Sequence, residues 1–218
     1  MRNTNTPIAA EGYPFIAGAA IIAVTLAVLG SKISVFLFLA VLFGALTLFI
    51  VFFFRNPERS TPADEKAVIA PADGVVIYLG PSREEHLGEE MTKISIFMSV
   101  FNVHVNRVPI TGKVLDTFYI EGKFLDVRDE RATFENEQAG LVIETAKGLK
   151  MVVVQVAGLI ARRIVCYAAK GDQLVRGRRY GLIRFGSRLD VYLPRETTVK
   201  VKMGEKTVAG ETILGLLP

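Results

Sequence analysis

The pair Gly186-Ser187 holds the nucleophile best placed to react with the chain itself. Glycine has no side chain to block an approach and tolerates strained backbone, so the serine hydroxyl can attack the preceding carbonyl and convert the amide to an ester. The attack needs a base for the hydroxyl proton and backbone amides to hold the oxyanion. Elimination would then split the chain, and hydrolysis of the resulting dehydroalanine would leave a pyruvoyl group. A turn or bulge between two strands is the competing interpretation, and the local pattern does not separate the two.

Two other residues have the chemistry to assist Ser187. In VFNVHVNRVP a strand period places His104 and Asn106 on one face and Arg107 on the other. Histidine is the natural proton carrier near neutral pH, although a lone histidine on a strand is usually structural. Asp73 lies in the turn PADG, where a carboxylate ordinarily bonds nearby backbone amides but can also orient a histidine.

The elements that must position these residues are predicted to be short strands. β-branched or alternating runs separated by glycine turns predict a mainly β fold, a barrel or sandwich and α+β at most, for residues 55–218. The polar segment 121–140 is predicted to be a loop that can cover a site. The predicted strands include 75–79, 91–97, 151–156 and 199–202.

The N-terminal part, residues 1–54, is predicted to be a helical membrane hairpin. Two uncharged apolar runs, 13–29 and 33–54, are long enough to span or dip into a bilayer. Arg2 and Arg55 flank the hairpin, so we expect both its ends, and the catalytic domain, on the cytoplasmic side of the cell membrane. A cleaved signal peptide is less favoured, because no small-residue cleavage site precedes a soluble start.

Composition limits the remaining function classes. The net charge of +4 suits an anionic membrane surface and gives no indication of nucleic acid as a partner. A single cysteine, Cys166, excludes an intrachain disulfide. His86 and His104 are the only two histidines, which is a poor ligand set, so we expect no metal.

Four motifs in order closely resemble the short bacterial and archaeal form of phosphatidylserine decarboxylase. The likeness covers nearly the whole chain, including the VAGETILG ending, and is most specific around Gly186-Ser187. The motifs are FFRNPER, PADG at 71–74, HVNRVP at 104–109 and RFGSRLDVYLP at 184–194.

The resemblance implies a proenzyme that cuts itself between Gly186 and Ser187. Residues 1–186 would form the β chain and residues 187–218 the α chain, with Ser187 converted to the N-terminal pyruvoyl group. This group would be the cofactor, without a metal, and would form a Schiff base with the amine of phosphatidylserine. Decarboxylation would then give phosphatidylethanolamine and CO2. The implied partners are the phospholipid, the membrane and the two chains of one precursor, and a homodimer is left open.

The resemblance also assigns roles to individual residues. Ser187 would be the self-cleavage nucleophile, His104 the base, and Asp73 the residue that orients His104. Longer family members have two nearby histidines and Leu-Gly-Ser-Thr at the cut, whereas this chain has one histidine and Phe185-Gly186-Ser187-Arg188. His104 can therefore serve both reactions.

Five clustered arginines allow two interpretations, contacts with lipid phosphates or a solvated basic face. They are Arg176, Arg178, Arg179, Arg184 and Arg188.

Three alternative functions are weighed against this one. The first is the same pyruvoyl chemistry on another serine phospholipid, such as archaetidylserine. The second is a non-catalytic β carrier or binding module on a membrane anchor, which would need a modifiable lysine in an exposed hairpin. The third is a membrane-tethered zinc peptidase, for which His86 in a charged loop offers a poor ligand set.

Overall fold

The computed structural model covers most of the chain and divides it into two compact units. One unit is Asn5–Glu58, and the other contains Arg59–Pro218. Arg2 and Phe185, which entered the predictions above, lie outside the described residues. The predicted functional division after residue 54 stays a prediction. The described residues are 6–129, 131–159, 163–184 and 186–218.

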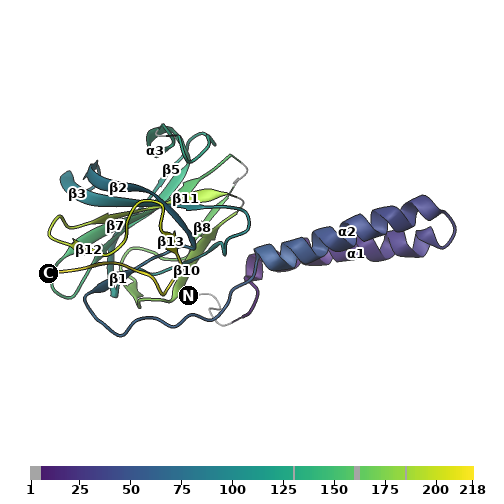
Figure 1. The fold of residues 1–218 in the computed structure, drawn as a ribbon, viewed down its shortest axis with the longest axis horizontal. Coiled ribbons are helices and arrows are strands. Elements are labelled where there is room, and N and C mark those ends of the chain that lie inside the picture. Colours follow the sequence, from purple (N-terminus) through teal and green to yellow (C-terminus); the bar gives the residue numbers. More distant parts are fainter. Residues whose placement is uncertain (1–5, 130, 160–162, 185) are drawn as a thin grey trace. The chain divides into compact units, whose positions relative to one another are not determined.

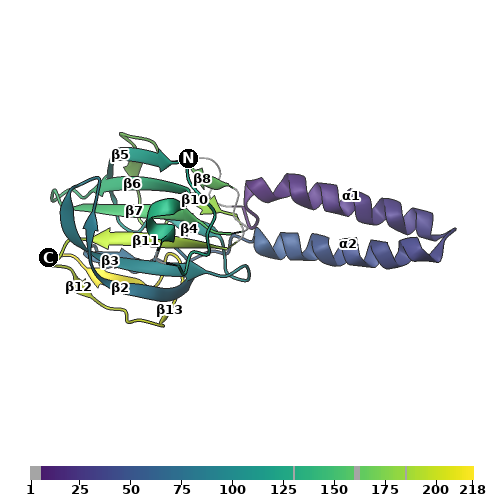
Figure 2. The same ribbon diagram turned by 90° about the horizontal axis from the view of Figure 1, so that it is seen from above.

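The smaller unit is a helical hairpin, as its two apolar runs predicted. After a short 3-10 turn at Ala10–Gly12, helix α1 covers Tyr13–Gly30 and helix α2 covers Ser34–Phe53. The two helices run antiparallel (Figure 2). Pro14 lies in the first turn of α1, where its missing N–H removes no helical hydrogen bond.

Both helices are long and apolar enough to cross a membrane. Backbone hydrogen bonds close the open end of the hairpin, from Ala9 to Phe54 (N···O 2.8 Å) and from Asn56 to Pro7 (2.7 Å). Large apolar side chains along the helices are more than half exposed, which indicates lipid rather than water as their surroundings. Examples of these exposed apolar side chains are Ile21, Val24, Val28, Val41 and Leu48. The unit therefore suggests membrane association.

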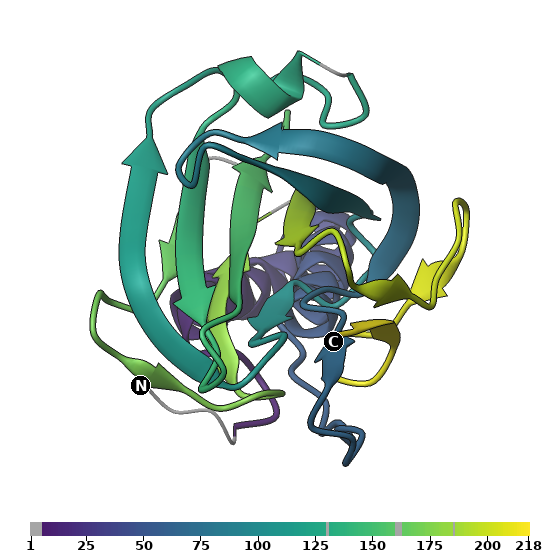
Figure 3. The same ribbon diagram turned by 90° about the vertical axis from the view of Figure 1, so that its left-hand side faces the viewer.

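The larger unit is mainly β, as predicted (Figure 1). Eight of its strands form an antiparallel sheet in the order β13-β2-β3-β11-β7-β6-β5-β9, and Figure 3 shows this sheet curling around an enclosed core. The strands of this sheet are β2 (Gly74–Glu84), β3 (Glu89–Met98), β5 (Gly112–Ile120), β6 (Gln138–Glu144), β7 (Lys150–Ala157), β9 (Gln173–Leu174), β11 (Ser187–Leu193) and β13 (Lys206–Thr207).

Two three-stranded sheets complete the unit, with the orders β1-β14-β12 and β4-β10-β8. The HVNRVP motif supplies β4, whose Asn106 pairs with Gly181 of β10. The strands of these sheets are β1 (Ala67–Ile69), β4 (Val105–Arg107), β8 (Ile164–Cys166), β10 (Arg179–Ile183), β12 (Thr198–Val199) and β14 (Ile213–Leu216).

Strand β11 lies in the middle of the large sheet and is buried on both faces. Its alternation directs Leu189 and Val191 into the inner core. Tyr192 packs instead in a second apolar cluster on the outer face. The Gly186-Ser187 bond lies where the chain leaves the β4-β10-β8 sheet and enters the large sheet, so neither a simple hairpin turn nor a continuous strand describes it.

Segment 121–137 forms the predicted loop, and we call it the cover loop. It contains one short helix, α3 (Ala132–Glu135), which lies over the outer face of the large sheet in both Figures 1 and 2. The predicted boundary at residue 140 is wrong, because residues 138–140 already belong to buried strand β6. Near the C-terminus the predicted alternation of burial holds at Val201, although the strand itself ends at Val199.

Candidate functional site

The Gly186-Ser187 bond joins a glycine in the left-handed conformation to a buried serine, the predicted nucleophile. Gly186 has φ +65°, in the left-handed region that favours glycine. Ser187 is fully buried and begins β11, opposite Met98 of β3 and Ala157 of β7. Its hydroxyl donates a hydrogen bond to the Met98 sulfur, with Oγ···Sδ 3.4 Å. A thioether is a weak acceptor, so this contact holds the hydroxyl without strongly competing with a base.

The carbonyl oxygen of Gly186 lies directly against the backbone of Gly158. A Cβ atom added to Gly158 would overlap this oxygen and would also come within 3.2 Å of Val127 in the cover loop. Only glycine therefore fits at position 158 without moving the Gly186 carbonyl. Gly158 carries no sequence signal, because the contact joins segments that are remote in the chain.

Met98 also connects the cleavage strand to the HVNRVP motif. The Asn106 side chain donates to the Met98 sulfur (Nδ2···Sδ 3.8 Å), and Gln155 donates to Asn106 (Nε2···Oδ1 2.8 Å). Ser187, Met98, Asn106 and Gln155 thus form a buried polar chain. Neither Met98 nor Gln155 carried a sequence signal, because each lies inside an ordinary apolar strand pattern.

His104 is buried, with 2% of its surface exposed, and its tautomer follows from one contact. Its Nδ1 lies 2.9 Å from the carbonyl oxygen of Asn102, which can only accept. Nδ1 therefore carries the proton in the neutral ring, and the lone pair is on Nε2. This is the tautomer that a base needs, and a backbone carbonyl fixes it.

A tight turn holds the Asn102 carbonyl in place. The Asn102 side-chain oxygen accepts hydrogen bonds from the Ser99 amide (2.9 Å) and the Ser99 hydroxyl (2.8 Å). The Asn102 amide donates back to the Ser99 carbonyl at 3.0 Å. Ser99 and Asn102 therefore position His104, and the spacing of a polar pair three residues apart in the turn was the available signal.

The described contacts of the Asp73 carboxylate are with the Arg59 side chain and the Ala209 backbone. Its carboxylate accepts two hydrogen bonds from Arg59 (2.9 and 3.1 Å) and one from the Ala209 amide (2.8 Å). Burial and the neighbouring Arg59 lower the pKa of Arg107, while the Asp73 carboxylate acts in the opposite direction. The described partners of Asp73 thus lie in the segment before β1 and in the segment before β14. Its predicted role in orienting His104 stays a prediction.

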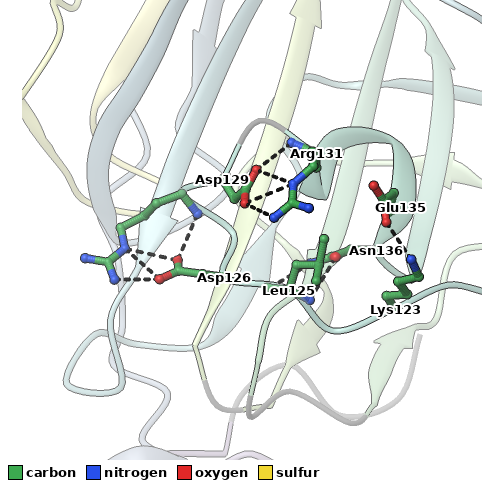
Figure 4. A network of polar contacts seen from close by, with 8 residues as sticks. Lys123, Leu125, Asp126, Asp129, Arg131, Glu135 and Asn136 are labelled. Carbon is green, nitrogen blue, oxygen red and sulfur yellow. Dashed lines mark hydrogen bonds and ion pairs between the residues drawn. The ribbon is translucent and has the colours of Figure 1, made fainter.

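The cover loop is anchored beside the bond at 186–187. Asn136 is fully buried and donates to the carbonyls of Ala157 (2.8 Å) and Leu125 (2.9 Å), so it ties the loop to the residue that precedes Gly158. Figure 4 shows the contacts between Asn136 and Leu125 and the ion pairs Lys123–Glu135 and Asp129–Arg131 along the loop. The hydrogen bonds from Arg128 lower the pKa of Asp126 to about 2.

The chain is similar to known phosphatidylserine decarboxylases over most or all of its length. The sequence profile of the family described as phosphatidylserine decarboxylase matches residues 46–215. The phosphatidylserine decarboxylase proenzyme of Geobacter metallireducens is 90% identical over 218 residues, and the match covers 100% of both chains. The proenzymes of Geobacter sulfurreducens and Geotalea uraniireducens are each 72% identical over the same full length.

The chain belongs to the phosphatidylserine decarboxylase family. This membership confirms the resemblance that the four motifs indicated. Three residues outside the four motifs contact them. Met98 and Gly158 contact the Gly186-Ser187 pair, and Asn102 contacts His104 of the HVNRVP motif.

The arginine cluster of this family member is not a uniformly solvated basic face. Arg176 donates to backbone carbonyls, including that of Ala67 at 2.7 Å, and so fastens the connector. Arg179 is buried, with its guanidinium over the Tyr167 ring. Arg188 binds Asp190 on the outer face of β11, on the opposite side of the sheet from the Ser187 hydroxyl.

Among the described residues no group of three or more histidine, cysteine or acidic side chains is arranged to hold a metal ion. His86 stacks on Phe118 and lies 3.3 Å from Glu84. Burial raises the pKa of the Cys166 thiol, which disfavours the reactive thiolate.

The contact between Gly158 and the scissile carbonyl gives a first prediction. Replacing Gly158 with alanine should slow self-cleavage at least about 100-fold, because the new methyl group displaces the carbonyl that Ser187 attacks. The measurement is the fraction of cut chain over time in a cell-free translation. Gly80→Ala is the matched control, since its Cβ would meet only the exposed side chain of Tyr78, whose hydroxyl oxygen is nearest at 3.3 Å. Equal cleavage of both variants would contradict the prediction.

The turn that positions His104 gives a second prediction. Ser99→Ala removes a hydroxyl hydrogen bond of about 1 kcal/mol from Asn102 and should slow cleavage about fivefold. His104→Ala, which removes the base itself, should slow cleavage about 100-fold or more. The same time course should be recorded across pH, because a displaced imidazole also shifts the pH at which the rate changes. Cleavage of Ser99→Ala at the wild-type rate and pH profile would show that the turn does not position the imidazole.

Proposed function

We propose that this protein is a membrane-associated, self-processing enzyme that decarboxylates phosphatidylserine to phosphatidylethanolamine and CO2. The observation that carries the proposal is the buried Ser187 after a left-handed Gly186, in a chain 90% identical to a phosphatidylserine decarboxylase proenzyme. The first reaction is then maturation of the chain, and the second is turnover of lipid.

Maturation begins with Ser187 and His104. The hydroxyl leaves its weak contact with Met98, Nε2 of His104 takes the proton, and Oγ attacks the Gly186 carbonyl carbon. The C–N bond breaks as the serine amine leaves, which gives an ester between Gly186 and Ser187. Loss of the Ser187 Cα proton and of the Gly186 carboxylate then leaves dehydroalanine, and water converts this to the pyruvoyl group with release of ammonia.

The fold can keep residue 187 in place after the cut. Residues 187–193 remain paired with β3 on one side and β7 on the other, so the new N-terminus does not depend on the broken bond for its position. The pyruvoyl group supplies a carbonyl that takes the substrate amine and accepts the electrons released with CO2. His104, protonated at Nε2, returns a proton to the carbon that has lost CO2. Burial of residue 187 limits access of water to that carbon.

Both the proposed phospholipid substrate and the apolar hairpin support a reaction at a membrane. We propose that the larger unit lies on the cytoplasmic side, because Arg55 and Arg59 follow α2 directly and cytoplasmic flanks are enriched in basic residues. The pairing of the two precursor chains follows from the proposed cut. A homodimer stays a prediction.

Intact mass and denaturing gels test the proposal directly. The wild-type protein should give fragments 1–186 and 187–218, the smaller one blocked to N-terminal sequencing and sensitive to reagents for ketones. Ser187→Ala should remain one chain and release no CO2 from phosphatidylserine. Ser187 is buried and pairs through its backbone, so the alanine variant should fold. A single intact chain in an active wild-type preparation would rule out the proposal.

A paired experiment tests the part played by Asp73. Asp73→Asn and Arg59→Met each break the same ion pair, so we expect both to destabilise the larger unit by about 1–3 kcal/mol. If Asp73 also orients His104, Asp73→Asn should slow cleavage much more than Arg59→Met does. Thermal unfolding and the cleavage time course measure the two effects, and equal cleavage rates in the two variants would contradict the role of Asp73 toward His104.

A further inference from the structure

The outer face of the large sheet carries a pocket of about 390 Å³. Strands β2, β3 and β11 form its floor, and the cover loop forms one wall. Three of its described lining residues are basic, namely Lys93, Arg128 and Arg188, and none is acidic. Hydroxyl groups and the exposed ring of Phe134 make up much of the remaining lining.

This pocket is separate from the site at Ser187. Side chains alternate along β11, so Arg188 and Asp190 point to the face opposite Ser187. The register confirms the outer position, since Asp190 pairs with Ser95, which lines the pocket. Arg188 is thus next to the cut in sequence, but its guanidinium lies across the sheet from the reacting hydroxyl.

The floor of the pocket holds more positive than negative charge. Asp190 accepts a hydrogen bond from Arg188 (Nη2···Oδ2 2.9 Å) and forms ion pairs with Lys93 (3.0 Å) and with Nε of Arg188 (2.8 Å), so two cations share one carboxylate. The side chains of Lys93, Arg188 and Asp190 are 6%, 4% and 2% exposed. A buried cation without a full counter-charge is costly, and an anion in the adjacent pocket would offset that cost.

Two further observations agree with an anion-binding role. Burial lowers the pKa of Lys93, and this effect outweighs the opposing charge of Asp190, while the charge of Arg188 contributes less in the same direction as burial. Thr133 accepts hydrogen bonds from Arg188 (2.8 Å) and Lys93 (3.4 Å), which leaves its hydroxyl hydrogen to donate to a ligand. Arg128 is paired with Asp126 but lines the pocket on the solvent side.

We propose that this pocket binds a phosphate group. Arg188 also donates to the Val127 carbonyl (2.8 Å), so its guanidinium contributes mainly charge, while Lys93, Arg128 and several hydroxyls supply donors. Together they offer more donors than a carboxylate has acceptor positions, whereas a phosphate can use them. The volume leaves room for a small substituent on the phosphate. Inorganic phosphate and the phosphodiester of a lipid head group share this chemistry, and the proposal does not depend on the decarboxylation assigned above.

Calorimetric titration of the full-length protein in detergent tests the proposal. The probes are inorganic phosphate and glycerophosphoserine, and the protein carries Ser187→Ala so that neither cleavage nor turnover contributes heat. We expect saturable binding of at least one probe, weakened at least about tenfold by Lys93→Met, because a charge-assisted contact is lost. Lys93→Met leaves Arg188 bound to Asp190, so the fold should persist, and thermal unfolding checks this.

The control variant is Lys200→Met, which removes an exposed lysine elsewhere in the same unit and should bind as the parent does. Binding of inorganic phosphate alone would identify a site for the free ion, and binding of glycerophosphoserine alone would identify a head-group site. Absence of saturable binding in the millimolar range, or equal affinity in Lys93→Met and the parent, would overturn the proposal.

Discussion

The pairing of β11 between β3 and β7 is the constraint on which the rest of the site depends. It fixes Ser187 against Met98 on one side and Ala157 on the other, and through Ala157 it brings Gly158 to the carbonyl of Gly186. The same ladder separates the two faces of the strand. The hydroxyl of Ser187 lies on the inner face, while the charged groups of Arg188 and Asp190 lie on the outer face.

Much of the architecture could be predicted because it follows from local pattern. The apolar runs gave the helical hairpin, and the β-branched runs gave the strands that surround Ser187. The Gly-Ser pair could be found as a candidate, and family resemblance singled it out. Gly158 and Met98 could not be found in this way. Their importance comes from contacts across the fold, and each looks ordinary in its own segment.

The partners of the charged residues could not be predicted from the sequence. A carboxylate in a turn and a cluster of arginines are chemically versatile, and only tertiary structure decides their partners. The described contacts of Asp73 are with Arg59 and the Ala209 amide, and its role in orienting His104 stays a prediction. Arg176 and Arg188 bind groups of the same chain. Histidine was easier to interpret, although the group that sets its tautomer is a backbone carbonyl that no side-chain motif reveals.

The place of the bond between two sheets has a consequence for the mature molecule. Residues 187–218 contribute β11 to the middle of the large sheet, β13 to its edge beside β2, and β14 beside β1. In a chain cut between residues 186 and 187, the two polypeptides contribute neighbouring strands to the large sheet and to the β1-β14-β12 sheet. The shorter polypeptide therefore cannot dissociate unless both of these sheets come apart. Such a pair folds once, as a single chain. After unfolding, reassembly of the two polypeptides is a bimolecular reaction that depends on protein concentration. The stability of a cut molecule then depends on how slowly it unfolds rather than on reversible refolding.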